Sequence, residues 1–142
     1  MRYHPMIFCE TPSLTLLAGL PGSGKSTLTR RLKALGAIIV SLDAIRAELG
    51  DVNDQSRNTD VLAIAQMRVE AALLSGQWVV LDATNLRRAW RQRWERLAAE
   101  LQVPIRIHWV RTPLLVCLWR NWRRERRVPV RVILRMWRET EY

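Results

Sequence analysis

A glycine-rich segment directly after a short apolar run limits what this chain can fold into. Residues 19–27 have the sequence Gly-Leu-Pro-Gly-Ser-Gly-Lys-Ser-Thr, and residues 14–18 before them are largely apolar. A strand that leads into such a turn and then into a helix aims backbone N–H groups and the positive end of the helix at one anionic ligand. The segment therefore predicts a P-loop with a nucleoside triphosphate as its ligand.

Each residue type in this segment suits phosphate binding. We expect the glycines to let the backbone close around the phosphates, and Lys25 to reach the β and γ oxygens. The hydroxyl of Ser26 is expected to face Mg²⁺. The residues expected to bind ATP or another nucleoside triphosphate in this segment are Gly22, Ser23, Gly24, Lys25, Ser26 and Thr27.

Apolar runs alternate with helical patterns along the chain, which is typical of an α/β fold with a compact parallel sheet and helices on both faces. A single domain over residues 1–142 is expected, with 1–12 as an N-terminal extension and 50–57 as a polar connection. Trp90 and Trp94 are expected to face the core. The predicted strands are 14–18, 37–41, 78–82 and 105–110, and the predicted helices are 25–35, 43–49, 60–74, 88–101, 114–122 and 130–139.

The chain is strongly basic, with 23 Lys and Arg against 13 Asp and Glu and a formal net charge of +10. Such a surface favours polyanions, but a basic surface is also often only a solvated one, so composition leaves nucleic acid open as a partner. Cys9 and Cys117 are too few and too far apart to indicate a zinc site or a disulfide framework. No apolar run reaches membrane-spanning length, so we expect no membrane partner and a cytoplasmic location. The oligomeric state stays open.

Polar residues follow the predicted strand 78–82. Asp82 occupies the usual position of the carboxylate that assists Mg²⁺ in a P-loop fold. Because ligands of open α/β sheets bind outside the carboxyl ends of the strands, Thr84 and Asn85 are expected to face the P-loop as substrate-binding residues. An alternative makes the Thr84-Asn85 pair a helix cap.

Asp43 and Arg46 lie three residues apart after the predicted strand 37–41 and therefore share a helical face. A carboxylate beside the γ-phosphate can deprotonate an acceptor hydroxyl, and an arginine next to it can hold an anionic part of the acceptor. The alternative is that Asp43 is only the N-cap of the helix.

An arginine cluster precedes the last predicted helix, within a segment of about 120–129 that we call the lid. Arg120, Arg124 and Arg127 have the i, i+4, i+7 spacing of one helical stripe that could close over a triphosphate, so Arg120 and Arg124 are further candidate ATP-binding residues. The neighbouring stripe is apolar and is expected to pack against the protein; it contains Leu115, Trp119 and Trp122. The full cluster is Arg120, Arg123, Arg124, Arg126 and Arg127.

Together these motifs resemble the phage-type polynucleotide 5′-kinase family, in the same order from residue 14 to about 137. The most selective features are the Asp43-x-x-Arg46 pair, Arg120-Asn121-x-x-Arg124 and Val128-Pro129. The resemblance implies a P-loop kinase fold and transfer of the γ-phosphate of ATP to a 5′-hydroxyl end of DNA or RNA.

Carried over by position, the resemblance makes Lys25, Asp43, Arg46 and Arg124 the catalytic residues. Asp43 would be the general base and Arg46 would hold the acceptor's 3′-phosphate, while Arg124 would act from the lid and Ser26 would serve ATP and Mg²⁺.

Ala83 departs from the family pattern, which has an Asp directly before the Thr-Asn pair. The sequence therefore leaves open whether Asp82 serves the metal or the acceptor. A small-molecule kinase and a nucleotide-binding module without phosphotransfer remain alternatives.

Overall fold

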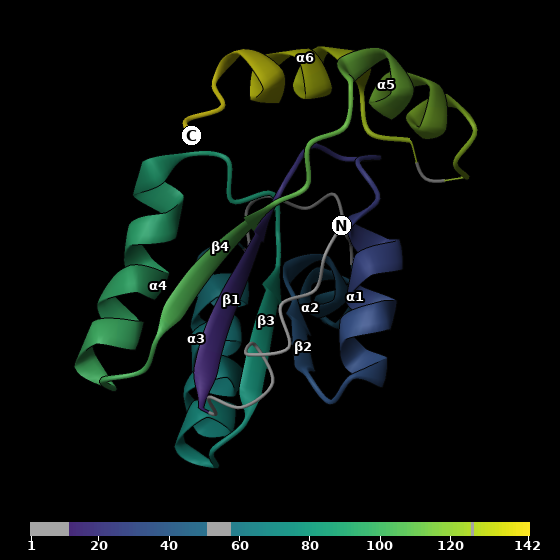
Figure 1. The fold of residues 1–142 in the computed structure, drawn as a ribbon. Helices are drawn as coiled ribbons and strands as arrows, with labels where there is room; N and C mark the ends of the chain where they lie inside the picture. The colour runs from purple at the N-terminus through teal and green to yellow at the C-terminus, as the bar shows by residue number, and fades with distance from the viewer. Residues whose placement is uncertain (1–11, 51–57, 126) are drawn as a thin grey trace.

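The computed structural model describes residues 12–50, 58–125 and 127–142, and Figure 1 shows their arrangement. Outside these residues lie Cys9, Arg126, most of the N-terminal extension and all but the first residue of the predicted connection 50–57. The strands are β1 (Ser13–Ala18), β2 (Ile38–Ser41), β3 (Trp78–Asp82) and β4 (Ile105–Trp109). The helices are α1 (Lys25–Ala34), α2 (Leu42–Leu49), α3 (Asn58–Leu74), α4 (Arg88–Glu100), α5 (Leu114–Trp122) and α6 (Val130–Arg138).

The four strands form one parallel sheet in the order β2-β3-β1-β4. Its register aligns the carboxyl ends of the strands: Asp82 of β3 is level with Leu17 of β1 on one side and with Ser41 of β2 on the other. The connections that leave these strands therefore start side by side. Helices α5 and α6 lie across this end of the sheet (Figure 1).

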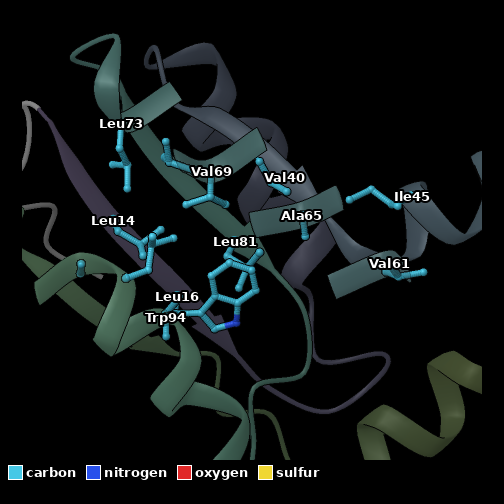
Figure 2. Close-up of a cluster of buried hydrophobic side chains, with 13 residues drawn as sticks. Leu14, Leu16, Val40, Ile45, Val61, Ala65, Val69, Leu73, Leu81 and Trp94 are labelled. Atoms are coloured by element: carbon cyan, nitrogen blue, oxygen red, sulfur yellow. The ribbon is translucent and has the colours of Figure 1, made fainter. Parts of the chain in front are cut away.

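Strand residues alternate between two apolar layers because successive side chains of a strand point to opposite faces. On one face, α3 and α4 pack over a large cluster that includes Leu14, Leu16, Leu81 and Trp94 (Figure 2). On the other face, α1 packs over a smaller cluster around Leu17 and Val80.

The predicted α/β fold with helices on both faces of a parallel sheet is confirmed, and every predicted strand end lies within one residue of the observed end. Helix α3 begins at Asn58, two residues earlier than predicted. The core position predicted for Trp90 is wrong, because its side chain is 42% exposed. Trp90 lies in the first turn of α4, where its ring contacts the guanidinium of Arg87 and not the core.

Among the helices of the described residues, none combines the length and the apolar character needed to cross a bilayer.

Candidate active site

The P-loop joins β1 to α1 in a backbone conformation that two glycines allow. Gly22 and Gly24 have φ angles of 82° and 102°, a region that residues with a Cβ avoid. Gly24 is the N-cap of α1 and provides no side-chain cap, and the first turn of α1 contains no acidic residue. The amino end of α1 therefore combines N–H donors with a positive dipole, which suits an anion such as phosphate.

The segment after β4 supports the P-loop from the other side. A Cβ on Gly22 would lie 2.8 Å from the carbonyl oxygen of Cys117 in α5, so only a glycine fits there. The hydroxyl of Thr112 donates a hydrogen bond to the carbonyl of Ser23 at 2.7 Å. The Ser23 hydroxyl is buried beside Gly19. Any contact of Ser23 with phosphate would therefore come from its main chain.

Lys25 folds back over the loop, where its ammonium group donates hydrogen bonds to the carbonyls of Gly19 and Leu20. Burial lowers the pKa of Lys25 from its usual 10.5 to about 8, although the carboxylates of Asp82 and Asp43 act in the opposite direction. A buried cation with a depressed pKa lacks sufficient negative charge nearby, and phosphate oxygens would supply it.

Asp82 and Ser26 are the two residues predicted to hold Mg²⁺. Asp82 ends β3 next to the P-loop, and burial raises the pKa of its carboxyl group, which the positive charge of Lys25 partly offsets. Ser26 is exposed in the first turn of α1. A hydroxyl and a carboxylate oxygen are the hard ligands that Mg²⁺ prefers, and Mg²⁺ usually takes its remaining ligands from phosphates and water. The residues present fit this ion.

Asp43 is not the cap of α2. The N-cap is Ser41, whose hydroxyl accepts a hydrogen bond from the backbone N–H of Ala44 at 3.2 Å. The cap interpretation of Asp43 is therefore wrong. Its side chain is 78% exposed, and the charge of the carboxylate influences the pKa of both Lys25 and Asp82. The carboxylate thus lies within electrostatic reach of Lys25 and does not cap α2.

Arg46 orients Asp43 from the next turn of α2. One terminal nitrogen of its guanidinium donates to Asp43 Oδ1 at 2.8 Å, and the other donates to Asn58 Oδ1 at 2.8 Å. Within the described residues, Arg46 Nε is buried without a partner. Both terminal nitrogens of Arg46 are therefore held, one by Asp43 and the other by Asn58.

The Thr84-Asn85 pair connects β3 to β1 and the P-loop through one backbone and one side-chain hydrogen bond. The carbonyl of Thr84 accepts from the N–H of Gly19, the first residue of the P-loop, at 3.0 Å. The buried amide of Asn85 donates to the carbonyl of Leu17 at 2.7 Å. Neither residue caps α4, whose N-cap is Arg87. The cap alternative is therefore wrong. The side-chain amide nitrogen of Asn85 is already hydrogen-bonded to β1.

The predicted arginine stripe does not form, because α5 ends at Trp122 and leaves Arg124 and Arg127 in the following turn. Like charges three or four residues apart disfavour continuation of a helix. Arg120 nevertheless reaches the P-loop and donates to the carbonyl of Gly22 at 3.2 Å. The positive charge of Arg124 contributes to the lowered pKa of Lys25, so it also lies within electrostatic reach of the site.

Two asparagines that were not predicted as site residues hold these parts in place. Asn58 fixes Arg46, as described above. Asn121 is buried and exchanges two hydrogen bonds of 2.8 Å with the backbone N–H and carbonyl of Val128, which closes the turn of the lid. Asn121 belongs to the Arg-Asn-x-x-Arg pattern, which is a signal for it, whereas no local pattern indicates Asn58.

Residues 14–141 match the protein family described as AAA domain. The chain belongs to this family. The match covers the P-loop, the segment after β3 and the lid, which are the parts assembled at the carboxyl end of the sheet.

Solved structures share the fold of this AAA domain protein. One is the Pnkp1/Rnl/Hen1 RNA repair complex, with a TM-score of 0.82 and 22% identity over 92% of this chain. The match covers only 44% of the chain in that complex, so this chain spans less than half of its length. A second is Chaetomium thermophilum Kti12 in complex with ADP-AlF3, with a TM-score of 0.73 and 20% identity; the match covers 91% of this chain and 80% of that one. A third is Mycobacterium tuberculosis APS kinase CysC in complex with AMPPNP and APS, with a TM-score of 0.64 and 21% identity; the match covers 80% of this chain and 70% of that one. The P-loop kinase fold implied by the resemblance to phage-type polynucleotide 5′-kinases is confirmed.

Proposed function

We propose that this protein is an ATP-dependent polynucleotide 5′-hydroxyl kinase that transfers the γ-phosphate to a 5′-OH end of DNA or RNA. The observation that carries the proposal is the position of Asp43: its carboxylate has no capping duty and lies within electrostatic reach of Lys25 at the P-loop. Such a carboxylate can accept the proton of an acceptor hydroxyl as the oxygen attacks the γ-phosphorus.

The remaining side chains supply the charge that this reaction needs. In the proposed complex, Lys25 binds the β- and γ-phosphate oxygens, and Arg120 and Arg124 approach the same oxygens from the lid. Ser26 and Asp82 would hold Mg²⁺, which would offset negative charge on the phosphates. Arg46 holds the Asp43 carboxylate in place, and its positive charge attracts an anionic group of the acceptor.

The nucleic-acid substrate is supported by charge and by fold. The net charge of +10 favours a polyanionic acceptor over a neutral one. One structure with the same fold is a component of an RNA repair complex, whereas others are an APS kinase and a gluconokinase. We include the small-molecule acceptors as competitors in the test. The cytoplasmic location stays a prediction.

Transfer of labelled γ-phosphate tests the proposal directly. The acceptors are 5′-OH oligonucleotides of DNA and RNA and a panel of sugars and nucleosides, all at equal concentration, and a reaction without an added acceptor measures hydrolysis. We expect transfer to the oligonucleotides, its loss in Lys25→Ala, and its retention in Lys33→Ala, which removes the only other lysine from the exposed side of α1. Transfer only to a small hydroxyl compound, or hydrolysis alone, would contradict the polynucleotide assignment.

A further inference from the structure

The outer face of α5 carries apolar side chains that remain exposed among the residues that the structure describes. Leu115, Trp119 and Trp122 are 78%, 54% and 64% exposed and follow the i, i+4, i+7 spacing of one helical face. Their predicted packing against the protein is therefore wrong. Helix α5 lies at the outside of the molecule, beyond the carboxyl end of the sheet (Figure 1), so this face is available to a ligand.

Arginines of the following turn stack on these rings. The guanidinium of Arg123 lies 4.8 Å from the ring centroid of Trp119, and that of Arg127 lies 6.0 Å from the ring of Trp122. Arg124, in the same turn, instead influences the pKa of Lys25 at the P-loop. The arginines of this turn therefore serve two different sites. Stacked guanidinium groups limit the motion of the indoles and place positive charge beside them.

The charge around this face selects the kind of ligand. From residue 114 to residue 138 the described part of the chain contains seven arginines and one glutamate. A second copy of this chain would bring its own arginines against these, and the repulsion of like charges argues against self-association as the occupant. Insertion into a lipid bilayer would bury the stacked guanidinium groups, which is costly. Bases that stack on an indole leave the arginines free to bind phosphates.

We propose that the outer face of α5 binds single-stranded nucleic acid, with bases stacked on Trp119 and Trp122 and phosphates bound by Arg123 and Arg127. The proposal rests on the proposed function for its ligand class and extends it. The strand is held on the outside of the same lid whose inner side faces the P-loop. Stacking on aromatic rings tolerates any base, so the surface binds strands without strong sequence preference.

The test measures binding apart from catalysis. Fluorescence anisotropy of a labelled thymidine oligonucleotide, at fixed salt and without ATP, compares Trp119→Ala, Trp122→Ala and Trp119→Phe with the wild type. The matched control is Trp90→Ala, since Trp90 is also an exposed tryptophan under an arginine, at 5.5 Å, but on α4. We expect each alanine variant of α5 to weaken binding by about 5- to 100-fold, with little effect of Trp119→Phe or Trp90→Ala.

Two results would overturn the proposal. One is an affinity of the α5 alanine variants equal to that of Trp90→Ala. The other is an unchanged oligonucleotide affinity together with lost self-association in sedimentation, or with lost adhesion to phosphatidylserine vesicles. Phosphotransfer by the wild type to a dinucleotide acceptor is measured in parallel. If the wild type transfers phosphate but the α5 alanine variants bind the oligonucleotide normally, only the proposed binding surface is refuted. If binding depends on the tryptophans but the wild type transfers no phosphate, only the proposed kinase function is refuted.

Discussion

At the scale of single residues, the cap of α2 decides how Asp43 can be tested. Because Ser41 is the N-cap, Asp43→Asn removes the carboxylate without removing the cap. We expect turnover to fall by about 10² to 10⁴ while the dissociation constant for ATP changes little. The substitution also removes the ion pair with Arg46. Because the Asp43 side chain is exposed, the free energy of unfolding should change by less than about 1 kcal/mol. Single-turnover kinetics and ATP titration measure the two effects.

The control for Asp43→Asn is Ser41→Ala. This variant removes the cap of α2 and should lower the free energy of unfolding by about 1 kcal/mol. Near-normal turnover of Asp43→Asn would remove Asp43 from the chemical step.

Lys25 should make stability depend on pH in a definite direction. Its folded-state pKa of about 8 lies below the ordinary 10.5, so the unfolded state holds more protons between these two pH values. The free energy of unfolding contributed by Lys25 therefore rises as the pH rises through this window. Denaturant unfolding gives the free energy of unfolding of the wild type and of Lys25→Met at each pH. The difference between the two should rise through this window by up to about 3 kcal/mol.

Lys33→Met is the matched control for this comparison, because Lys33 is exposed on the same helix. Its difference from the wild type should stay flat with pH. A flat difference for Lys25→Met as well would show that burial does not depress the pKa of Lys25.

At the scale of elements, the contact between the P-loop and α5 couples nucleotide binding to the lid. Gly22→Ala introduces a positive-φ strain of about 1–2 kcal/mol and also a clash with the Cys117 carbonyl at 2.8 Å. The matched control is Gly76→Ala, because the φ of Gly76 is 79° and that of Gly22 is 82°. A Cβ on Gly76 meets nothing within 4 Å, so this variant measures the backbone strain without the clash. We expect Gly22→Ala to lose more stability than Gly76→Ala and also to lose ATP affinity, measured by thermal unfolding and calorimetry. Equal losses in both variants would mean that α5 does not depend on this contact.

At the scale of the whole molecule, one buried arginine ties the C-terminal segment to the sheet. Arg91 donates to the carbonyl of Asn85 at 2.9 Å and to that of Glu141 at 2.7 Å, and its guanidinium lies 5.0 Å from the ring of Trp109. The N–H of Glu141 also donates to the carbonyl of Leu86 at 2.8 Å. Arg91 thus joins α4, the end of β4 and the segment after α6.

Arg91→Ala should therefore destabilise the protein far more than a surface substitution would. It removes two charge-assisted hydrogen bonds and leaves a buried carbonyl without its donor, at a cost of about 3 kcal/mol or more. The matched control is Arg93→Ala on the exposed side of the same helix, which should cost less than about 1 kcal/mol. Thermal unfolding measures both, and faster proteolysis near Glu141 should accompany only Arg91→Ala. Similar stability of the two variants would contradict the tie.

The sequence by itself determined the sheet, the P-loop and the group of polar residues at the strand ends. Strands and helices follow from the period of apolar residues, and the P-loop follows from glycines at positions where the backbone has a positive φ. Asp43 and Asp82 could be placed at the site because the carboxyl ends of parallel strands share one edge. These are local properties that a chain carries in consecutive residues.

Only the tertiary structure decided which side chains were free for chemistry. Asn85 is committed to Leu17, 68 residues away, and Asn58 fixes Arg46 across 12 residues. The helical spacing of Trp119 and Trp122 predicts a shared face, but not whether another element covers that face. Hydrogen bonding and burial depend on what lies opposite each residue after folding, and neither local periodicity nor motif spacing contains that information.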